Sequence, residues 1–145
     1  MKKTILIFLF FVAVVADAQL RKIPADVTDA FASKYPHATK VEWRDKLQYF
    51  EASFQLNGAT ITAGFSSKGE WENSERLLDF NDLPDDVRDG FLKSKYADWK
   101  KNTIAEAQEL GKPLQYRISV QKSGVQKKNL YFDTNGKLLK ENISL

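Results

Sequence analysis

The sequence predicts an α+β protein made of two tandem units, each a helix followed by four antiparallel strands. Three observations predict this class. A line of sequence recurs sixty positions later, stretches of alternating apolar and polar residues follow each copy, and short turn sequences separate these stretches. Helices covering one face of an antiparallel sheet form such a layered fold. Joining the units edge to edge would hide an exposed strand edge, so we expect one continuous sheet with both helices on one face.

The repeated line opens each unit and predicts its helix. Residues 23–31 read IPADVTDAF and residues 83–91 read LPDDVRDGF. Proline suits the first helical turn, and the aspartates near the start favour the helix dipole. The apolar residues that recur at helical spacing form one face: Val27, Ala30, Phe31 and Tyr35, then Val87, Phe91 and Tyr96.

Two differences separate the helices of the repeats. Pro36 ends the first helix, because the residue before a proline is pushed out of helical conformation. The second copy has one extra residue before Tyr96, and Gly90 replaces Ala30. Glycine inside a helix costs up to about 1 kcal/mol relative to alanine. We therefore expect Gly90 to mark a close packing contact.

Alternation of apolar and polar residues predicts the strands. Asn57-Gly58 is a strong hairpin signal, and Ser123-Gly124 takes its place in the second unit. The segment between the units, 79–82, is a short hinge. The expected strands are 40–44, 49–56, 59–65 and 70–72 in the first unit, then 103–110, 114–121, the stretch around Leu130 and Phe132, and the stretch around Leu138.

The N-terminus has the pattern of an export signal. Lys2 and Lys3 precede an apolar run over 5–15, and Ala16-Asp17-Ala18 is a small-x-small cleavage pattern. We expect residues 1–18 to be a signal peptide cut between Ala18 and Gln19. The alternative is an uncleaved anchor, although the run is shorter than the roughly 20 residues of a span. Once the signal peptide is removed, the protein would be periplasmic or secreted and would have no membrane span. Its two units would cover residues 19–81 and 82–145.

Composition excludes some classes of function. Cleavage would remove Lys2, Lys3 and Asp17 from totals of 22 basic and 19 acidic side chains, which leaves a nearly balanced surface. Such a balance, without a long basic run, argues against a nucleic-acid partner. There is no cysteine, so an exported chain of this kind depends on packing and not on disulfides.

Two strings resemble a known family. Residues 31–43, FASKYPHATKVEW, are similar to the helix-to-strand junction of the PepSY-like family, also called β-lactamase-inhibitor-like. Residues 116–120 and 130–138 resemble the closing strands of a PepSY unit. The resemblance covers essentially 19–145. It implies a tandem α+β fold like that of β-lactamase inhibitor protein, with a sheet surface open to a partner, and it implies no catalytic residue and no cofactor.

Candidate sites for chemistry have simple structural explanations. His37 is the single histidine and lies in a turn, with no carboxylate placed beside it by spacing. The turn at Asp133 is similar to the start of a calcium loop but lacks the downstream glutamate. The aspartates at 26, 29, 85 and 86 lie at helix starts, where the dipole explains them. We expect no catalytic residue, no cofactor and no metal.

The polar face of the sheet is the candidate binding surface. The residues that parity places there are Tyr49, Glu51 and Ser53 in unit one, and Arg117, Ser119 and Tyr131 in unit two. Tyrosine and arginine are frequent in interface hot spots, but the same face could simply meet water.

The sequence thus favours an exported, non-enzymatic binding module whose partner is a protein in the cell envelope or outside the cell, with inhibition or regulation of a hydrolase as a possible role. A small-ligand-binding or envelope-stress periplasmic protein, with a pocket between helices and sheet, is the alternative. An enzyme built around His37 is the third hypothesis. The sequence leaves the oligomeric state open.

Overall fold

The computed structural model describes residues 22–144, and the predicted signal peptide lies outside them. Each unit is a helix followed by four strands, as expected. Unit one contains α1 (Ala25–Lys34), β1 (Thr39–Asp45), β2 (Phe50–Leu56), β3 (Ala59–Phe65) and β4 (Trp71–Leu77). Unit two contains α2 (Asp85–Leu92), β5 (Lys100–Glu109), β6 (Gln115–Gln121), β7 (Lys127–Phe132) and β8 (Leu138–Ile143), after a 3₁₀ turn at Phe80–Asp82.

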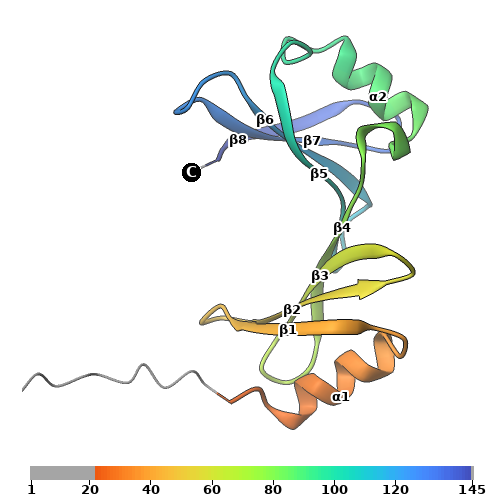
Figure 1. Ribbon diagram of the computed structural model, residues 1–145, viewed down its shortest axis with the longest axis vertical. Coiled ribbons are helices and arrows are strands. Elements are labelled where there is room, and N and C mark those ends of the chain that lie inside the picture. Colours follow the sequence, from red (N-terminus) through yellow and green to blue (C-terminus); the bar gives the residue numbers. More distant parts are fainter. Residues whose placement is uncertain (1–21, 145) are drawn as a thin grey trace, which may run out of the picture.

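The eight strands form one antiparallel sheet in the order β1 to β8 (Figure 1). Each strand pairs with the strand that follows it in the chain, and β4 pairs with β5 across the join between the units. The expected continuous sheet is confirmed.

The two helices pack on the same face of the sheet, each over its own unit. Val27 and Phe31 of α1 are buried with Phe50, Phe54 and Phe65 of the strands beneath. Phe31 lies edge-on to Phe54, with ring centroids 5.0 Å apart. In unit two, Val87 and Phe91 of α2 are buried in the same way, over Ile118, Val120, Leu130 and Phe132. The helical apolar face expected from the repeat is therefore correct.

A tight turn of each unit touches its helix. Gly69 and Gly136, in the turns that follow β3 and β7, both have positive φ, and a Cβ at either would meet backbone of the helix. At Gly136 it would lie 1.9 Å from the carbonyl oxygen of Asp86, and at Gly69 2.4 Å from that of Asp26. A Cβ on Gly90 would in turn lie 2.0 Å from the carbonyl oxygen of Gly136, so Gly90 does mark a close contact.

The central strands differ most from the sequence-based expectation. β4 runs to Leu77, well past the expected 70–72, and β5 begins at Lys100 and not at 103. The segment expected as a hinge contains a 3₁₀ turn. Apart from Trp71, Leu77 and Ile104, β4 and β5 carry polar or alanine side chains on both faces, so hydrophobic alternation does not delimit these strands.

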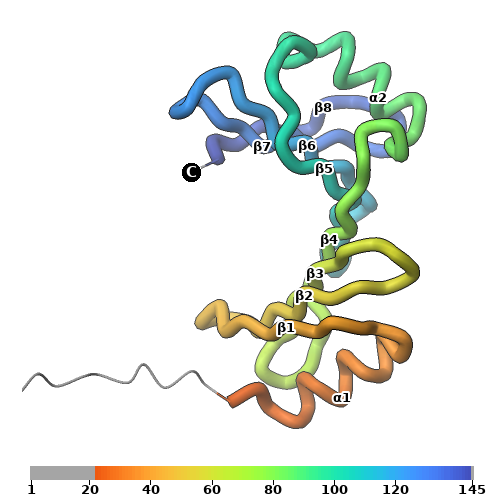
Figure 2. Tube along the Cα trace, in the orientation of Figure 1, coloured from red at the N-terminus to blue at the C-terminus, as the bar shows by residue number. Residues whose placement is uncertain are grey.

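The sheet bends between the units. Figure 2 shows α1 and α2 at opposite ends of the long axis, with β4 and β5 between them. Because each helix lies on the outer side of its half-sheet, the uncovered faces of the two halves turn toward each other.

Candidate functional site on the uncovered sheet face

The six residues predicted for the polar face all lie on the side of the sheet that carries no helix. Glu51 and Ser53 alternate with the buried Phe50, Ala52 and Phe54 of β2. Strand pairing extends this face across the join: Ser53 lies opposite Thr62, and Thr62 opposite Glu75. In unit two the same face carries Arg117 opposite Tyr131, and Ser119 opposite Asn129. All six predicted residues are partly exposed.

An ion pair spans the join between the units on this face. The Arg117 guanidinium of β6 donates to both carboxylate oxygens of Glu75 in β4, at 2.8 and 2.5 Å. Between them lies β5, where Ala105 and Ala107 occupy this face. Their small side chains leave room for the pair to cross the strand. Sequence reasoning missed Glu75, because its partner becomes visible only once β4 and β5 are paired.

Arg117 also anchors a polar network in unit two. It donates a hydrogen bond of 2.9 Å to the hydroxyl of Ser119, which is itself hydrogen-bonded to Asn129. The hydrogen bonds to Glu75 raise the pKa of Arg117, so the guanidinium stays charged. Burial raises the pKa of the neighbouring Tyr131, against the opposing effect of the Arg117 charge. The face therefore presents fixed charges and a neutral phenol.

A hollow lies beside this ion pair, over the join; we call it the sheet-face hollow. Its volume is about 480 Å³. Tyr49 and Tyr131 line it from the two units, and Gly64 lets the Tyr49 ring lie close to β3. Of the six predicted residues, Tyr49, Glu51 and Tyr131 line it, whereas Ser53, Arg117 and Ser119 lie outside it. Its other lining residues are Thr62, Glu72, Asn73, Ser74, Glu75, Ala107, Gln108 and Glu109.

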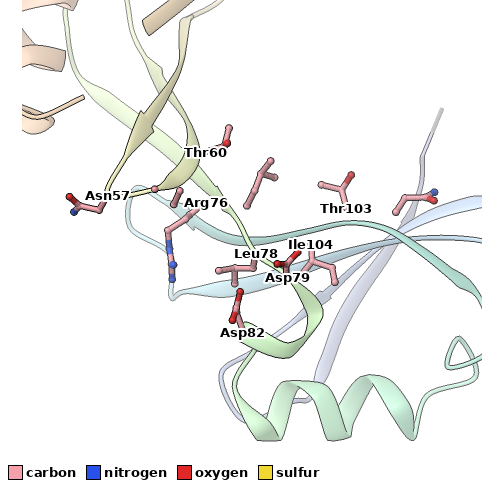
Figure 3. A pocket seen from close by; sticks show the side chains of 12 residues that line it. Asn57, Thr60, Arg76, Leu78, Asp79, Asp82, Thr103 and Ile104 are labelled. Atoms are coloured by element: carbon pink, nitrogen blue, oxygen red, sulfur yellow. The ribbon is translucent and has the colours of Figure 1, made fainter. Parts of the chain in front are cut away.

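A second hollow, the inter-unit hollow, lies at the end of the central strands. Its volume is about 550 Å³. Figure 3 shows the side chains that line it. The β2–β3 hairpin supplies Asn57 and Thr60 on one side, and the segment after β4 supplies Asp79 and Asp82. Arg76 faces it and pairs with Glu106 of β5 at 3.0 Å. Neither hollow is lined by a residue of α1 or α2, so neither is the helix–sheet pocket of the alternative hypothesis.

The remaining candidate residues lie apart from these hollows. His37 is exposed in the turn between α1 and β1. The Asp133 carboxylate accepts the backbone N–H groups of Asn135 and Lys137, both at 2.9 Å, which is the geometry of a closed hairpin turn. Within residues 22–144, no three potential metal ligands lie close enough together to hold an ion. Among the same residues, no helix has the length and apolar character to cross a membrane.

Several solved structures share this fold. A BLIP-like protein from Bacteroides fragilis is 28% identical to this chain and superposes with a TM-score of 0.80. The match covers 88% of this chain and 90% of the chain of that protein. A DUF2874 family protein from Bacteroides ovatus is 27% identical over 84% of this chain and 88% of its own, with a TM-score of 0.79.

A third structure, described as a putative periplasmic protein from Bacteroides eggerthii, is 23% identical over 84% of this chain and 89% of its own, with a TM-score of 0.78. It shows likeness in fold alone. No curated protein matches the sequence.

The family comparison agrees with the fold. A family model described as "putative beta-lactamase-inhibitor-like, PepSY-like" matches residues 48–140, from the turn before β2 into β8. This match spans most of the chain and both units. The chain belongs to the PepSY-like, beta-lactamase-inhibitor-like family.

Proposed function

We propose that the protein is an exported, non-enzymatic binding module that engages another protein through its uncovered sheet face. One observation carries the proposal: eight strands present a single bent face without helices, with the sheet-face hollow at its centre. Tyr49 and Tyr131 line that hollow, and tyrosine is among the residues that dominate interface energetics.

The site of action that we propose is the periplasm or the cell exterior. Two observations support it. The sequence begins with the pattern of a cleavable signal peptide over 1–18. A protein of the same fold from Bacteroides eggerthii is described as a putative periplasmic protein.

A secreted or periplasmic hydrolase is the partner class that we propose. The family description and the BLIP-like neighbour both support an inhibitory or regulatory role. The bend of the sheet supports it too, because a concave face can enclose a protruding loop of a partner. Fold alone does not fix function, so the role has to be tested on the site itself.

The test is binding and inhibition by two matched variants. Tyr49→Ala/Tyr131→Ala alters the sheet-face hollow, and Leu92→Ala/Leu139→Ala removes exposed apolar side chains elsewhere. A panel of purified envelope hydrolases, β-lactamases included, is titrated by calorimetry and by activity assay.

We expect at least one hydrolase to bind the wild-type protein. The face variant should bind it at least about 30-fold more weakly, as hot-spot losses of 2 kcal/mol imply, and the control should bind normally. Unchanged binding by a folded face variant would refute the sheet face as the site.

A second candidate function rests on the inter-unit hollow, where Arg76, Asp79, Asp82 and the amide of Asn57 surround about 550 Å³. Hydrogen-bonding groups of both charges would suit a small polar ligand. Native mass spectrometry of the purified protein would show such a ligand as added mass, and Asp82→Asn should remove it.

A further inference from the structure

The far end of unit two carries exposed apolar side chains on a protruding turn. Val125 lies in the turn between β6 and β7 and is 90% exposed, and Ile143 at the end of β8 is 77% exposed. Figure 1 shows this turn projecting from the upper half of the molecule, beside the end of β8. Together with the half-buried Trp99, both side chains line a hollow of about 340 Å³. We call this region, which also contains Lys122, Lys127 and Lys128, the basic end.

Lysines surround these apolar side chains. Lys122, Lys127 and Lys128 line the same hollow. Lys100 lies opposite Gln121, which lies opposite Lys127, so a further lysine belongs to this end of the sheet.

Acidic side chains neutralise only part of this charge. Glu141 pairs with Lys128 at 2.7 Å and with Lys95 at 3.6 Å. Asp98 lies in the segment between α2 and β5. Against these two carboxylates stand the lysines at 95, 100, 122, 127 and 128, so the basic end has a net positive charge.

We propose that the basic end docks on an anionic lipid surface. Lysines attract anionic headgroups, and apolar side chains on a protruding turn can enter the headgroup layer without unfolding any strand. The long lysine side chains can extend their ammonium groups toward phosphates while the aliphatic carbons stay close to Val125 and Ile143. The hollow of the basic end shares no lining residue with the sheet-face hollow, so lipid docking would leave the sheet-face hollow open to a protein.

Vesicle flotation tests the proposal with the protein from residue 19 onward. The vesicles contain either phosphatidylcholine alone or phosphatidylcholine with about 40% phosphatidylglycerol, an anionic content that gives a strong negative surface potential. We expect binding to the anionic vesicles only, and weaker binding at high salt, since salt screens exposed charges. Equal partition onto both vesicle types would overturn the proposal.

Two pairs of variants locate the contact. Lys122→Gln/Lys127→Gln should lower partition roughly 25-fold, at about fivefold per lysine, whereas Lys22→Gln/Lys68→Gln in unit one should change it little. Val125→Ser/Ile143→Ser should lower it about tenfold, against no change for the exposed pair Leu92→Ser/Leu110→Ser.

Circular dichroism confirms folding of each variant. Equal effects of the unit-one and unit-two lysine pairs would refute the basic end as the site. A loss with the lysine pair and none with Val125→Ser/Ile143→Ser would refute insertion of the turn. The sheet-face variant Tyr49→Ala/Tyr131→Ala should float normally, which separates this proposal from the proposed function.

Discussion

The hydroxyl of the buried Tyr96 is held by charged side chains at the surface. Tyr96 donates a hydrogen bond to Glu141 and accepts one of 3.2 Å from the Lys128 ammonium. Lys128 also donates to Glu141, and Lys95 lies near the same carboxylate. Hydrogen bonds from Lys128 and Tyr96 lower the pKa of Glu141 to about 2. A core residue thus depends on a carboxylate that remains ionised at any moderate pH.

This low pKa predicts a window of acid sensitivity. The folded pKa lies below the unfolded value, so ionised Glu141 stabilises the fold above about pH 4.5, and this contribution is lost as the pH falls toward about 2. Unfolding followed by fluorescence between pH 7 and pH 2 should show less loss of stability on acidification for Glu141→Gln than for wild type.

Direct titration provides the check. The Glu141 side-chain carbon, followed by NMR, should titrate near pH 2. A midpoint near 4.5 would contradict the geometry around Tyr96.

At the scale of elements, each helix is fixed to its sheet by a turn as well as by its apolar face. Gly136 touches the backbone of α2 at Asp86, and Gly69 makes the corresponding contact with α1 at Asp26. Both units therefore share a contact between the backbone of a turn and the backbone of a helix. In neither unit is there space for a side chain on the glycine of the turn.

Gly136→Ala should be strongly destabilising for this reason. The added Cβ would lie 1.9 Å from a backbone oxygen, in addition to the strain of alanine at φ +78. Gly111→Ala is the matched control, because Gly111 has φ +73 and open space around its Cβ position. We expect about 1 kcal/mol of destabilisation for the control, from backbone strain alone, and at least about 3 kcal/mol for Gly136→Ala. Urea unfolding measures both, and equal losses would show that the turn does not pack on α2.

The helices and the strands directly beneath them could be predicted because one side of each is apolar. Val27 and Phe31 recur at helical spacing, and Phe50, Ala52 and Phe54 alternate, so their buried faces are visible in the sequence. The central strands could not be delimited in this way. In β4, Glu75 and Arg76 point to opposite faces, and each forms an ion pair with unit two. In β5, Ala105 and Ala107 are small because the Arg117 side chain of β6 crosses that strand to reach Glu75.

The face of the candidate site could be predicted from the sequence, but the grouping of its residues could not. Parity placed Tyr49 and Tyr131 on the correct face, but their joint hollow depends on the pairing of β4 with β5. The sequence also contains no sign of Glu75 as the partner of Arg117, since 42 residues separate them.

At the scale of the whole molecule, two arginine–glutamate pairs join the units on opposite faces of the sheet. Glu75 in unit one pairs with Arg117 on the uncovered face, and Arg76 pairs with Glu106 on the helix side. The charges are reversed between the two faces, so each unit supplies one cation and one anion. Since the two cores are separate, these pairs and the β4–β5 hydrogen bonds hold the units in register.

A double-mutant cycle on Glu75 and Arg117 measures this connection. The Arg117 side chain is only 14% exposed, so Glu75→Ala would leave a largely covered charge without its partner and should cost about 2 kcal/mol. We expect a coupling energy of about 1–2 kcal/mol, compared with at most about 0.5 for the exposed pair Asp89 and Lys93 on α2. Equal coupling in both cycles would show that the pair on the sheet face does not hold the units together.

The strand order has a consequence for how the chain acquires its structure. Because β1 to β8 pair strictly in chain order, each strand pairs with the strand that precedes it in the sequence. Among these eight strands, no pairing joins an early strand to a strand far along the chain. Such local pairing shortens the loops that must close and favours fast folding. A chain that leaves a ribosome or a membrane pore with its N-terminus first can therefore fold unit one before unit two is available. The edge of β4 is then the template on which the strands of unit two assemble.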